Sequence, residues 1–175
     1  MKKILLFVTL FVLCLALTVS CSDNTQTKDD DNNTKSETLD DTNIKTHDVS
    51  AISKELGQLD IIVENTNREF LDNDLCDYYF SNSQLLSKVT NCVFFVSKTT
   101  ALYEVGVFKS DSEEKRAEII DDIEKRRENL ISTYELYSEE DKKIAEKMII
   151  KEDGDIVYYV ATPDNAAIEK VILSK

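Results

Sequence analysis

The sequence contains a single histidine, His47, and this scarcity excludes several kinds of chemistry. Ser-His-Asp and Cys-His catalysis need an imidazole beside the nucleophile, and histidine-based metal sites need more than one ligand. His47 lies where a polar segment meets the first apolar pattern of the chain. We therefore expect it to be a solvent-exposed linker residue.

Glycine is also scarce, since the chain has only Gly57, Gly106 and Gly154, and these are far apart. A loop that cradles phosphate needs clustered glycines before a helix, so no nucleotide site can be written. We expect neither a cofactor nor a metal ion.

Carboxylates are abundant, with 34 aspartates and glutamates, so counting alone does not exclude a paired-carboxylate hydrolase. Such an enzyme holds two carboxylates at a fixed separation in a cleft. None of those here is flanked by the aromatic, glycine-containing loops that usually build one. We therefore expect a protein that is not an enzyme.

The formal net charge is −13, and it becomes −15 without residues 1–20, which carry two lysines and no acidic residue. A surface this acidic repels phosphate backbones and anionic lipid. Binding to nucleic acid is therefore not expected.

No apolar run is long enough for a transmembrane helix, because the longest, residues 4–17, falls short of the roughly 20 residues needed. It follows Lys2 and Lys3 and precedes Ser20-Cys21, which is typical of a signal peptide. The segment resembles the lipobox of bacterial lipoproteins, although Thr18 occupies the place of the usual leucine.

This resemblance implies that Cys21 carries a diacylglyceryl group and becomes the first mature residue. Two acyl chains anchor a protein stably, whereas one holds it only marginally. The expected location is the outer face of the cell membrane. Ordinary secretory cleavage and an uncleaved membrane anchor are the alternatives.

Three parts of the chain are predicted: a signal peptide over residues 1–20, the lipidated cysteine with an acidic linker over residues 21–46, and one domain over residues 47–175. The linker is polar, lacks aromatic residues and includes the run Asp29-Asp30-Asp31, so it is expected to be disordered. As a flexible coil it would span roughly 25 to 30 Å. The domain could then stand clear of the membrane.

Two cysteines remain after Cys14 leaves with the signal peptide and Cys21 is lipidated. Cys76 and Cys92 could form a disulfide outside the cytoplasm, which would stabilise the domain by about 3 kcal/mol. Alternatively, they pack as free thiols, because Cys92 lies in an apolar run.

The order of the predicted elements indicates the fold class. Apolar spacing predicts a first helix over residues 48–63, followed by an irregular polar segment and short helical turns. A strand pair over residues 89–109, a long helix opened by a Ser110–Glu113 capping box, a strand pair over residues 148–162 and a last helix follow. The order α, β-β-α-β-β-α predicts a two-layer α+β domain, with helices on one face of a four-stranded antiparallel sheet.

One charged pair stands out. Glu104 lies within an apolar strand, and Arg126 lies close to the apolar stripe of the long helix. We hypothesise that they form an ion pair where the helix crosses the sheet. The alternative is that Glu104 points to solvent from the open sheet face, with Arg126 independent of it.

Three segments carry a resemblance to a family: residues 103–109 (YEVGVFK), residues 125–130 (KRRENL) with Tyr137, and residues 154–160 (GDIVYYV). They are similar to a domain of unknown function found in small lipoproteins of Gram-positive, clostridia-like bacteria. The resemblance covers about residues 75–172. It implies the architecture and the lipid anchor, and it transfers no catalytic residue.

The expected function is therefore a lipid-anchored extracytoplasmic domain that binds a protein, a wall component or a small ligand. We expect binding through the sheet face opposite the helices. Two alternatives remain: an accessory subunit of a membrane transporter or envelope complex, and a carboxylate-dependent hydrolase.

Overall fold

The computed structural model describes residues 44–175, which belong to one compact unit. The signal peptide, Cys21 and most of the acidic linker lie outside the described residues. Contacts of the domain already begin at Lys45, whose carbonyl accepts a hydrogen bond from the backbone of Asp155 (3.0 Å). Within residues 44–175, no helix is both long enough and apolar enough to cross a membrane.

Five antiparallel strands form one sheet in the order β1-β2-β3-β5-β4. The strands are β1 (Thr66–Glu69), β2 (Asn91–Ser97), β3 (Glu104–Lys109), β4 (Ile149–Asp153) and β5 (Ile156–Ala161). Both predicted hairpins are present, and β5 pairs with β3 to join them. The antiparallel α+β class is confirmed.

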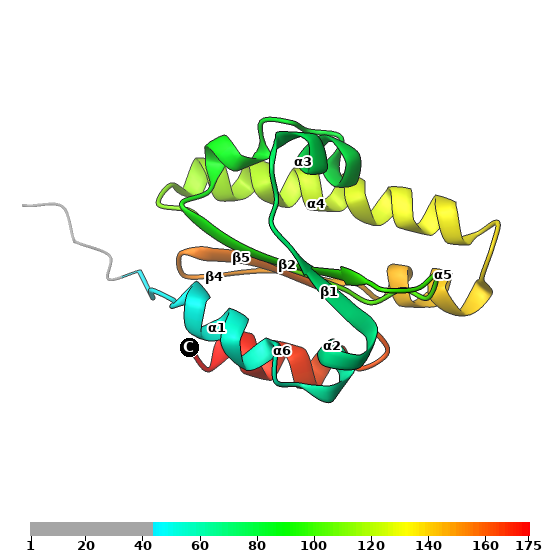
Figure 1. Cartoon of the computed structure of the whole chain (residues 1–175). Coiled ribbons are helices and arrows are strands. Elements are labelled where there is room, and N and C mark those ends of the chain that lie inside the picture. Colours follow the sequence, from blue (N-terminus) through cyan, green and yellow to red (C-terminus); the bar gives the residue numbers. More distant parts are fainter. Residues whose placement is uncertain (1–43) are drawn as a thin grey trace, which may run out of the picture. The chain divides into compact units, whose positions relative to one another are not determined.

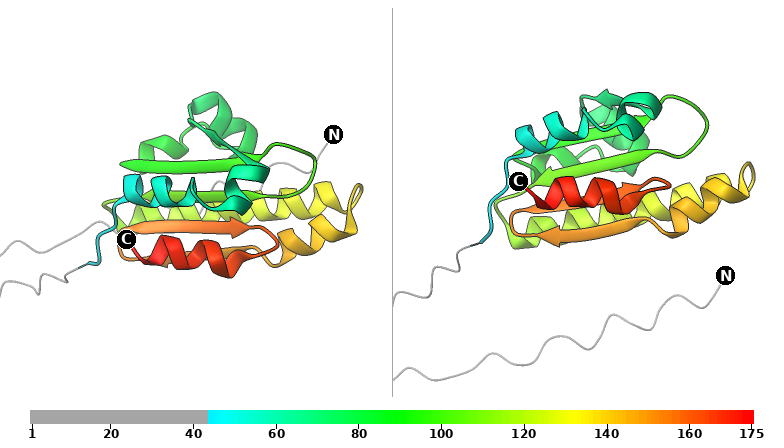
Figure 2. Two further views of the ribbon diagram at one scale, coloured as in Figure 1. Left: turned by 60° about the horizontal axis from the view of Figure 1, so that its bottom comes forward. Right: turned by 90° about the horizontal axis from the view of Figure 1, so that it is seen from below.

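Helices cover both faces of this sheet, so the domain has three layers (Figure 1). One layer contains α3 (Asn73–Phe80), the short 3-10 helix η1 (Leu85–Lys88) and α4 (Glu113–Tyr134), with α5 (Glu139–Glu146) at its end. The other contains α1 (Val49–Leu56), α2 (Asp60–Asn65) and α6 (Asn165–Leu173). In Figure 2, α1 and α6 lie side by side across the sheet.

The prediction of helices on one face was therefore wrong, and so was the expected open binding face. The physical reason lies in β5, where all six residues are buried. Val157 and Tyr159 face the core under α4, whereas Ile156 and Tyr158 face the core under α1 and α6. A strand that is apolar on both sides needs a cover on both sides.

The fifth strand, β1, lies in a segment expected to be irregular. Its four residues are largely polar, and it pairs only with β2, with Thr66 opposite Ser97 and Glu69 opposite Phe94. It follows a break at Gly57, where the predicted single helix of residues 48–63 divides into α1 and α2. Backbone pairing at a sheet edge does not require an apolar face, so the sequence pattern gave little sign of this strand.

The start of α4 also differs from the prediction. The helix is capped by Ser112, whose hydroxyl accepts a hydrogen bond from the Lys115 amide (3.3 Å). The hydroxyl of Ser110 instead donates to the carbonyl of Lys88 (2.8 Å) and is buried. Ser110 therefore joins η1 to the end of β3.

Gly106 on β3 is required by packing. It lies opposite Tyr159 of β5, whose ring passes over the place where a side chain at position 106 would start. A Cβ there would lie 2.8 Å from Cε2 of Phe108 and would collide with the Tyr159 ring. The missing side chain lets these two aromatic rings stack, with centroids 6.3 Å apart.

We predict that Gly106→Ala lowers the free energy of unfolding by roughly 1 to 3 kcal/mol, because a packed core must shift to admit the methyl group. Gly57→Ala is the matched control, since its Cβ would approach the Ser53 carbonyl only to 3.3 Å. Urea unfolding followed by circular dichroism measures both. Equal effects of the two substitutions would contradict the packing argument.

Candidate functional site

A buried ion pair joins α4 to the sheet, and its two members are Glu104 and Arg126. Nε of Arg126 donates to Oε1 of Glu104 (3.0 Å), and Nη2 donates to Oε2 (2.7 Å). Glu104 is 1% exposed, so it does not point to solvent. The structure therefore brings together the two residues that the sequence suggested as a pair.

Tyr159 completes this network, and sequence reasoning missed it. Its hydroxyl donates to Oε1 of Glu104 (2.6 Å). Burial, and then the neighbouring charge of Glu104, raises the pKa of Tyr159 well above its ordinary value, so the phenol stays protonated and donates. Burial lowers the pKa of Arg126, but the Glu104 carboxylate outweighs this and raises it.

The network has the properties of a structural element. Both oxygens of Glu104 are occupied by donors, and the Arg126 guanidinium lies over the ring of Tyr79, 5.2 Å from its centroid. A buried carboxylate with three donors on its two oxygens is already engaged within the fold. Its role is to fix α4 on the sheet.

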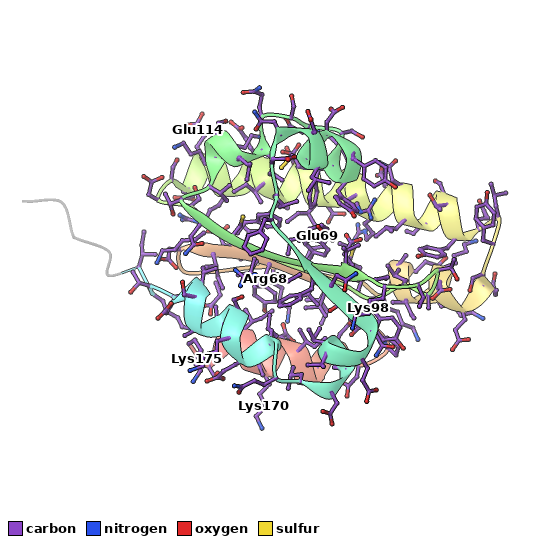
Figure 3. All side chains as sticks on the ribbon, viewed as in Figure 1. Arg68, Glu69, Lys98, Glu114, Lys170 and Lys175 are labelled. Atoms are coloured by element: carbon purple, nitrogen blue, oxygen red, sulfur yellow. The ribbon has the colours of Figure 1, made fainter. Side chains whose placement is uncertain are left out.

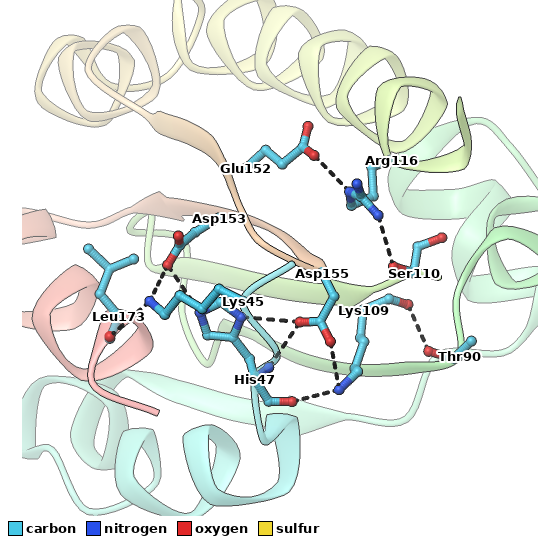
Figure 4. Close-up of polar contacts among 10 residues, drawn as sticks. All are labelled: Lys45, His47, Thr90, Lys109, Ser110, Arg116, Glu152, Asp153, Asp155 and Leu173. Atoms are coloured by element: carbon cyan, nitrogen blue, oxygen red, sulfur yellow. Dashed lines mark hydrogen bonds and ion pairs between the residues drawn. The ribbon is translucent and has the colours of Figure 1, made fainter. Parts of the chain in front are cut away.

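A second polar cluster fixes the start of the domain and is centred on His47 (Figure 4). The His47 ring is fully buried, with Nε2 3.0 Å from Oδ2 of Asp153 and Nδ1 3.1 Å from Oδ1 of Asp155. The expectation of a solvent-exposed His47 was therefore wrong. The Asp-Gly-Asp turn between β4 and β5 holds the histidine with its two carboxylates.

Two lysines complete this cluster, which we call the His47 latch: Lys45, His47, Lys109, Asp153 and Asp155. Nζ of Lys109 donates to the His47 carbonyl (2.7 Å) and lies 2.9 Å from Oδ2 of Asp155. Nζ of Lys45 lies 2.5 Å from Oδ2 of Asp153. The latch thus ties residues 45–47 to the β4–β5 turn and to the end of β3.

The latch changes the titration of its aspartates. The hydrogen bond from Lys45, more than any other contact, lowers the pKa of Asp153. Burial acts to raise the pKa of Asp155, but hydrogen bonds from Lys109 and His47 lower it below its ordinary value of 3.8. Both carboxylates are therefore held in the charged form.

The third feature is a surface hollow of about 500 Å³ between α1 and the β1 edge of the sheet. We call it the α1–β1 hollow. Its lining residues are Ser50, Ser53, Lys54 and Gly57 from the α1 segment, Arg68 from β1 and Phe95 from β2. Sequence reasoning singled out none of them for function.

The strand register explains why Arg68 reaches this hollow. Arg68 lies opposite Phe95, which faces the core under α1, whereas Glu69 lies opposite Phe94, which faces the core under α4. Figure 3 labels both Arg68 and Glu69 on the edge strand. Neighbouring residues of a strand point to opposite faces, so the Arg68 side chain lines the hollow and the Glu69 side chain does not.

Cys76 on α3 and Cys92 on β2 are free thiols that contact the same core under α4. Burial, and next the proximity of Cys92, raises the pKa of the Cys76 thiol to about 11. Burial also raises the pKa of Cys92. In this form both pack as small apolar side chains, and the disulfide alternative stays a prediction.

Among residues 44–175, no group of three or more histidine, cysteine, aspartate or glutamate side chains is arranged to hold a metal ion. In the His47 latch, all the carboxylates are already paired with lysine or histidine nitrogens. The latch is therefore an internal contact of the fold.

Residues 86–162 match a family model described as "Domain of unknown function (DUF4358)". The matched segment runs from η1 through β5 and so includes the Glu104–Arg126 pair, but not α1, β1 or α6. No curated protein and no solved structure matches the chain.

We predict that Glu104 and Arg126 are energetically coupled. Glu104→Ala leaves a buried guanidinium without its partner and should cost about 3 to 5 kcal/mol of unfolding free energy. The double variant with Arg126→Ala should cost clearly less than the sum of the single variants, as measured in a double-mutant cycle.

The exposed Glu124–Arg127 pair on the same helix is the matched control. Its two side chains are 38% and 35% exposed, so its coupling should stay below about 1 kcal/mol. Additive effects at Glu104 and Arg126 would show that the buried pair is not coupled.

We predict that acid weakens the domain through the His47 latch. Because the folded-state pKa values of Asp153 and Asp155 are lowered, their contribution to stability is complete above about pH 4 and is lost as the pH falls through the folded values. Asp155→Asn should lower the unfolding free energy at pH 7 and flatten its decline below about pH 4.

Unfolding in urea at a series of pH values tests this prediction. Asp111→Asn is the matched control, because the Asp111 side chain is 71% exposed and meets only Lys115, at 3.7 Å. An Asp155→Asn profile parallel to that of the unaltered chain would contradict the assignment of acid sensitivity to the latch.

Proposed function

We propose that this protein is a lipoprotein that displays a non-enzymatic binding domain at the outer face of the cell membrane. The observation that carries the proposal is Cys21, which follows a basic start, an apolar run and small residues. A diacylglyceryl group on its sulfur would supply two acyl chains, enough for stable anchoring. The part of the linker that precedes Lys45 then acts as an acidic spacer.

The domain itself supports a binding role. The Glu104 network and the His47 latch are paired within the fold, since the Glu104 oxygens face Arg126 and Tyr159 and the latch carboxylates face lysines and His47. Chemistry would need at least one such group free to exchange a proton or bind a reacting atom. The α1–β1 hollow, by contrast, presents side chains to a ligand from three elements.

The arrangement of the chain also suits a displayed domain. The His47 latch holds the first described residues firmly against the β4–β5 turn, next to the spacer. A spacer of this length would give the domain a reach of roughly 25 to 30 Å from the lipid. The α1–β1 hollow could then meet a protein, a wall component or a small ligand.

We predict that cells fed an alkyne-labelled fatty acid incorporate the label into this protein through Cys21. Cys21→Ser should abolish the label, because the thioether can form only on that sulfur. Cys14→Ser is the matched control and should keep it, since Cys14 would leave with the signal peptide. Intact-mass measurement should give a mature chain that begins at Cys21.

A mature chain that begins elsewhere, or label retained in Cys21→Ser, would overturn the anchor. Protease added to intact cells tests the location separately. It should degrade the domain without lysis, whereas a cytoplasmic protein of the same cells should survive.

A further inference from the structure

The α1–β1 hollow is basic although the protein as a whole is strongly acidic. Lys54 and Arg68 both line it, and its other lining residues are two serines, a glycine and a phenylalanine. The formal net charge of the chain is −13, so a pair of cations without an acidic residue in the same lining is unusual for its surface. The local field therefore favours an anion.

Neither cation is neutralised within the described part of the chain. Among residues 44–175, Lys54 and Arg68 have no ion pair and donate no side-chain hydrogen bond, whereas Lys45, Lys88 and Lys109 each meet an aspartate. The acidic residue that follows each cation in the sequence is engaged or turned away. Glu55 pairs with Lys175 (2.5 Å), and Glu69 lies on the other face of β1.

The serine hydroxyls add uncharged donors. Ser53 is only 6% exposed, and it lines the hollow together with Ser50. Phe95, 5% exposed, supplies an apolar floor. The Arg68 guanidinium lies over the Phe70 ring, 4.9 Å from its centroid, which restrains the long side chain beside the hollow.

Each cation also has a local explanation. Lys54 lies in the last turn of α1, where a positive charge stabilises a helix, and Arg68 stacks on Phe70. These effects account for the two residues separately. They do not account for their meeting in one hollow, together with the two serines Ser50 and Ser53.

We propose that the α1–β1 hollow binds an anionic group, a carboxylate or a phosphate, carried by a ligand with an apolar part that rests on Phe95. Lys54 and Arg68 provide the charge, with Arg68 able to donate two parallel hydrogen bonds. Ser50 and Ser53 donate from α1. This proposal rests on the proposed function, because it names the ligand chemistry of the displayed domain.

Protection of Lys54 from acetylation tests the site in the full-length chain, purified from whole cells in a non-ionic detergent. The probes are inorganic phosphate, phenyl phosphate and benzoate, each compared with chloride at equal ionic strength. Mass spectrometry should show that acetylation of Lys54 falls in a saturable way with at least one probe. Lys170 is the internal control, because it lies in the last turn of α6 and is also exposed.

The three probes distinguish a phosphate ligand from a carboxylate ligand. Saturation by both phosphates alone identifies a phosphate ligand, and saturation by benzoate alone identifies a carboxylate. Tighter binding of phenyl phosphate than of inorganic phosphate supports the apolar floor at Phe95. Equal protection of Lys54 and Lys170, or protection of neither, would overturn the proposal.

Calorimetric titration of variants is a second test. It uses the probe that protects Lys54 from acetylation in a saturable way. Arg68→Gln and Lys54→Gln should each weaken binding about tenfold, as expected for loss of one charge-assisted contact. Lys170→Gln should leave the Kd unchanged, and circular dichroism should show that all three variants fold. An unchanged Kd in Arg68→Gln would refute the site.

The tests of anion binding in the α1–β1 hollow do not depend on the lipid anchor. Acetylation and calorimetry report on the hollow whether or not Cys21 carries lipid, and fatty-acid labelling reports on Cys21 whether or not the hollow binds an anion. The two sets of experiments therefore show separately whether the anion site or the lipid anchor fails.

Discussion

Burial of the central sheet on both faces is the constraint on which the rest of the domain depends. β3 and β5 are the two strands between β2 and β4, and almost every side chain they contribute is buried. One helical layer cannot cover two apolar faces, so the short helices α1 and α6 must lie opposite α4. The buried polar groups of β3 and β5 are paired: Glu104 at the start of β3 meets Arg126 and Tyr159, and the Tyr158 hydroxyl donates to Glu169. That pairing avoids the cost of an uncompensated buried charge.

The sheet edge then determines where the proposed anion site lies. Because α1 and α6 pack side by side over β2, β3 and β5, the edge strand β1 extends beyond them. The space between α1 and that edge is the α1–β1 hollow, and the strand alternation directs Arg68 into it. The polar edge strand therefore contributes a wall of the hollow, while the apolar central strands contribute to the core.

The sequence predicted most of the elements that have a strong local pattern. The hairpin at Asp153-Gly154, the long helix α4 and the strands around Phe94 and Val107 are present, because their periodicity and turn chemistry act over a few residues. It also suggested the Glu104–Arg126 pair, because a charge within an apolar strand needs a partner. The second helical layer was missed, although the unbroken apolar run of residues 156–161 was a signal for it.

Contacts between distant segments were beyond prediction from the sequence. The His47 latch joins residues 45–47 to Asp153 and Asp155, more than a hundred positions away, and no local pattern encodes that pairing. The α1–β1 hollow depends on β1, whose polar sequence resembles a loop until β2 is beside it. Both features follow from the topology of the sheet.

The latch and the hollow are linked through α1. His47 is followed at once by Asp48, which caps α1 by accepting hydrogen bonds from the amides of Ser50 and Ala51 (2.9 and 3.0 Å). Fixing His47 to the β4–β5 turn therefore fixes the first turn of the helix that carries Ser50, Ser53 and Lys54.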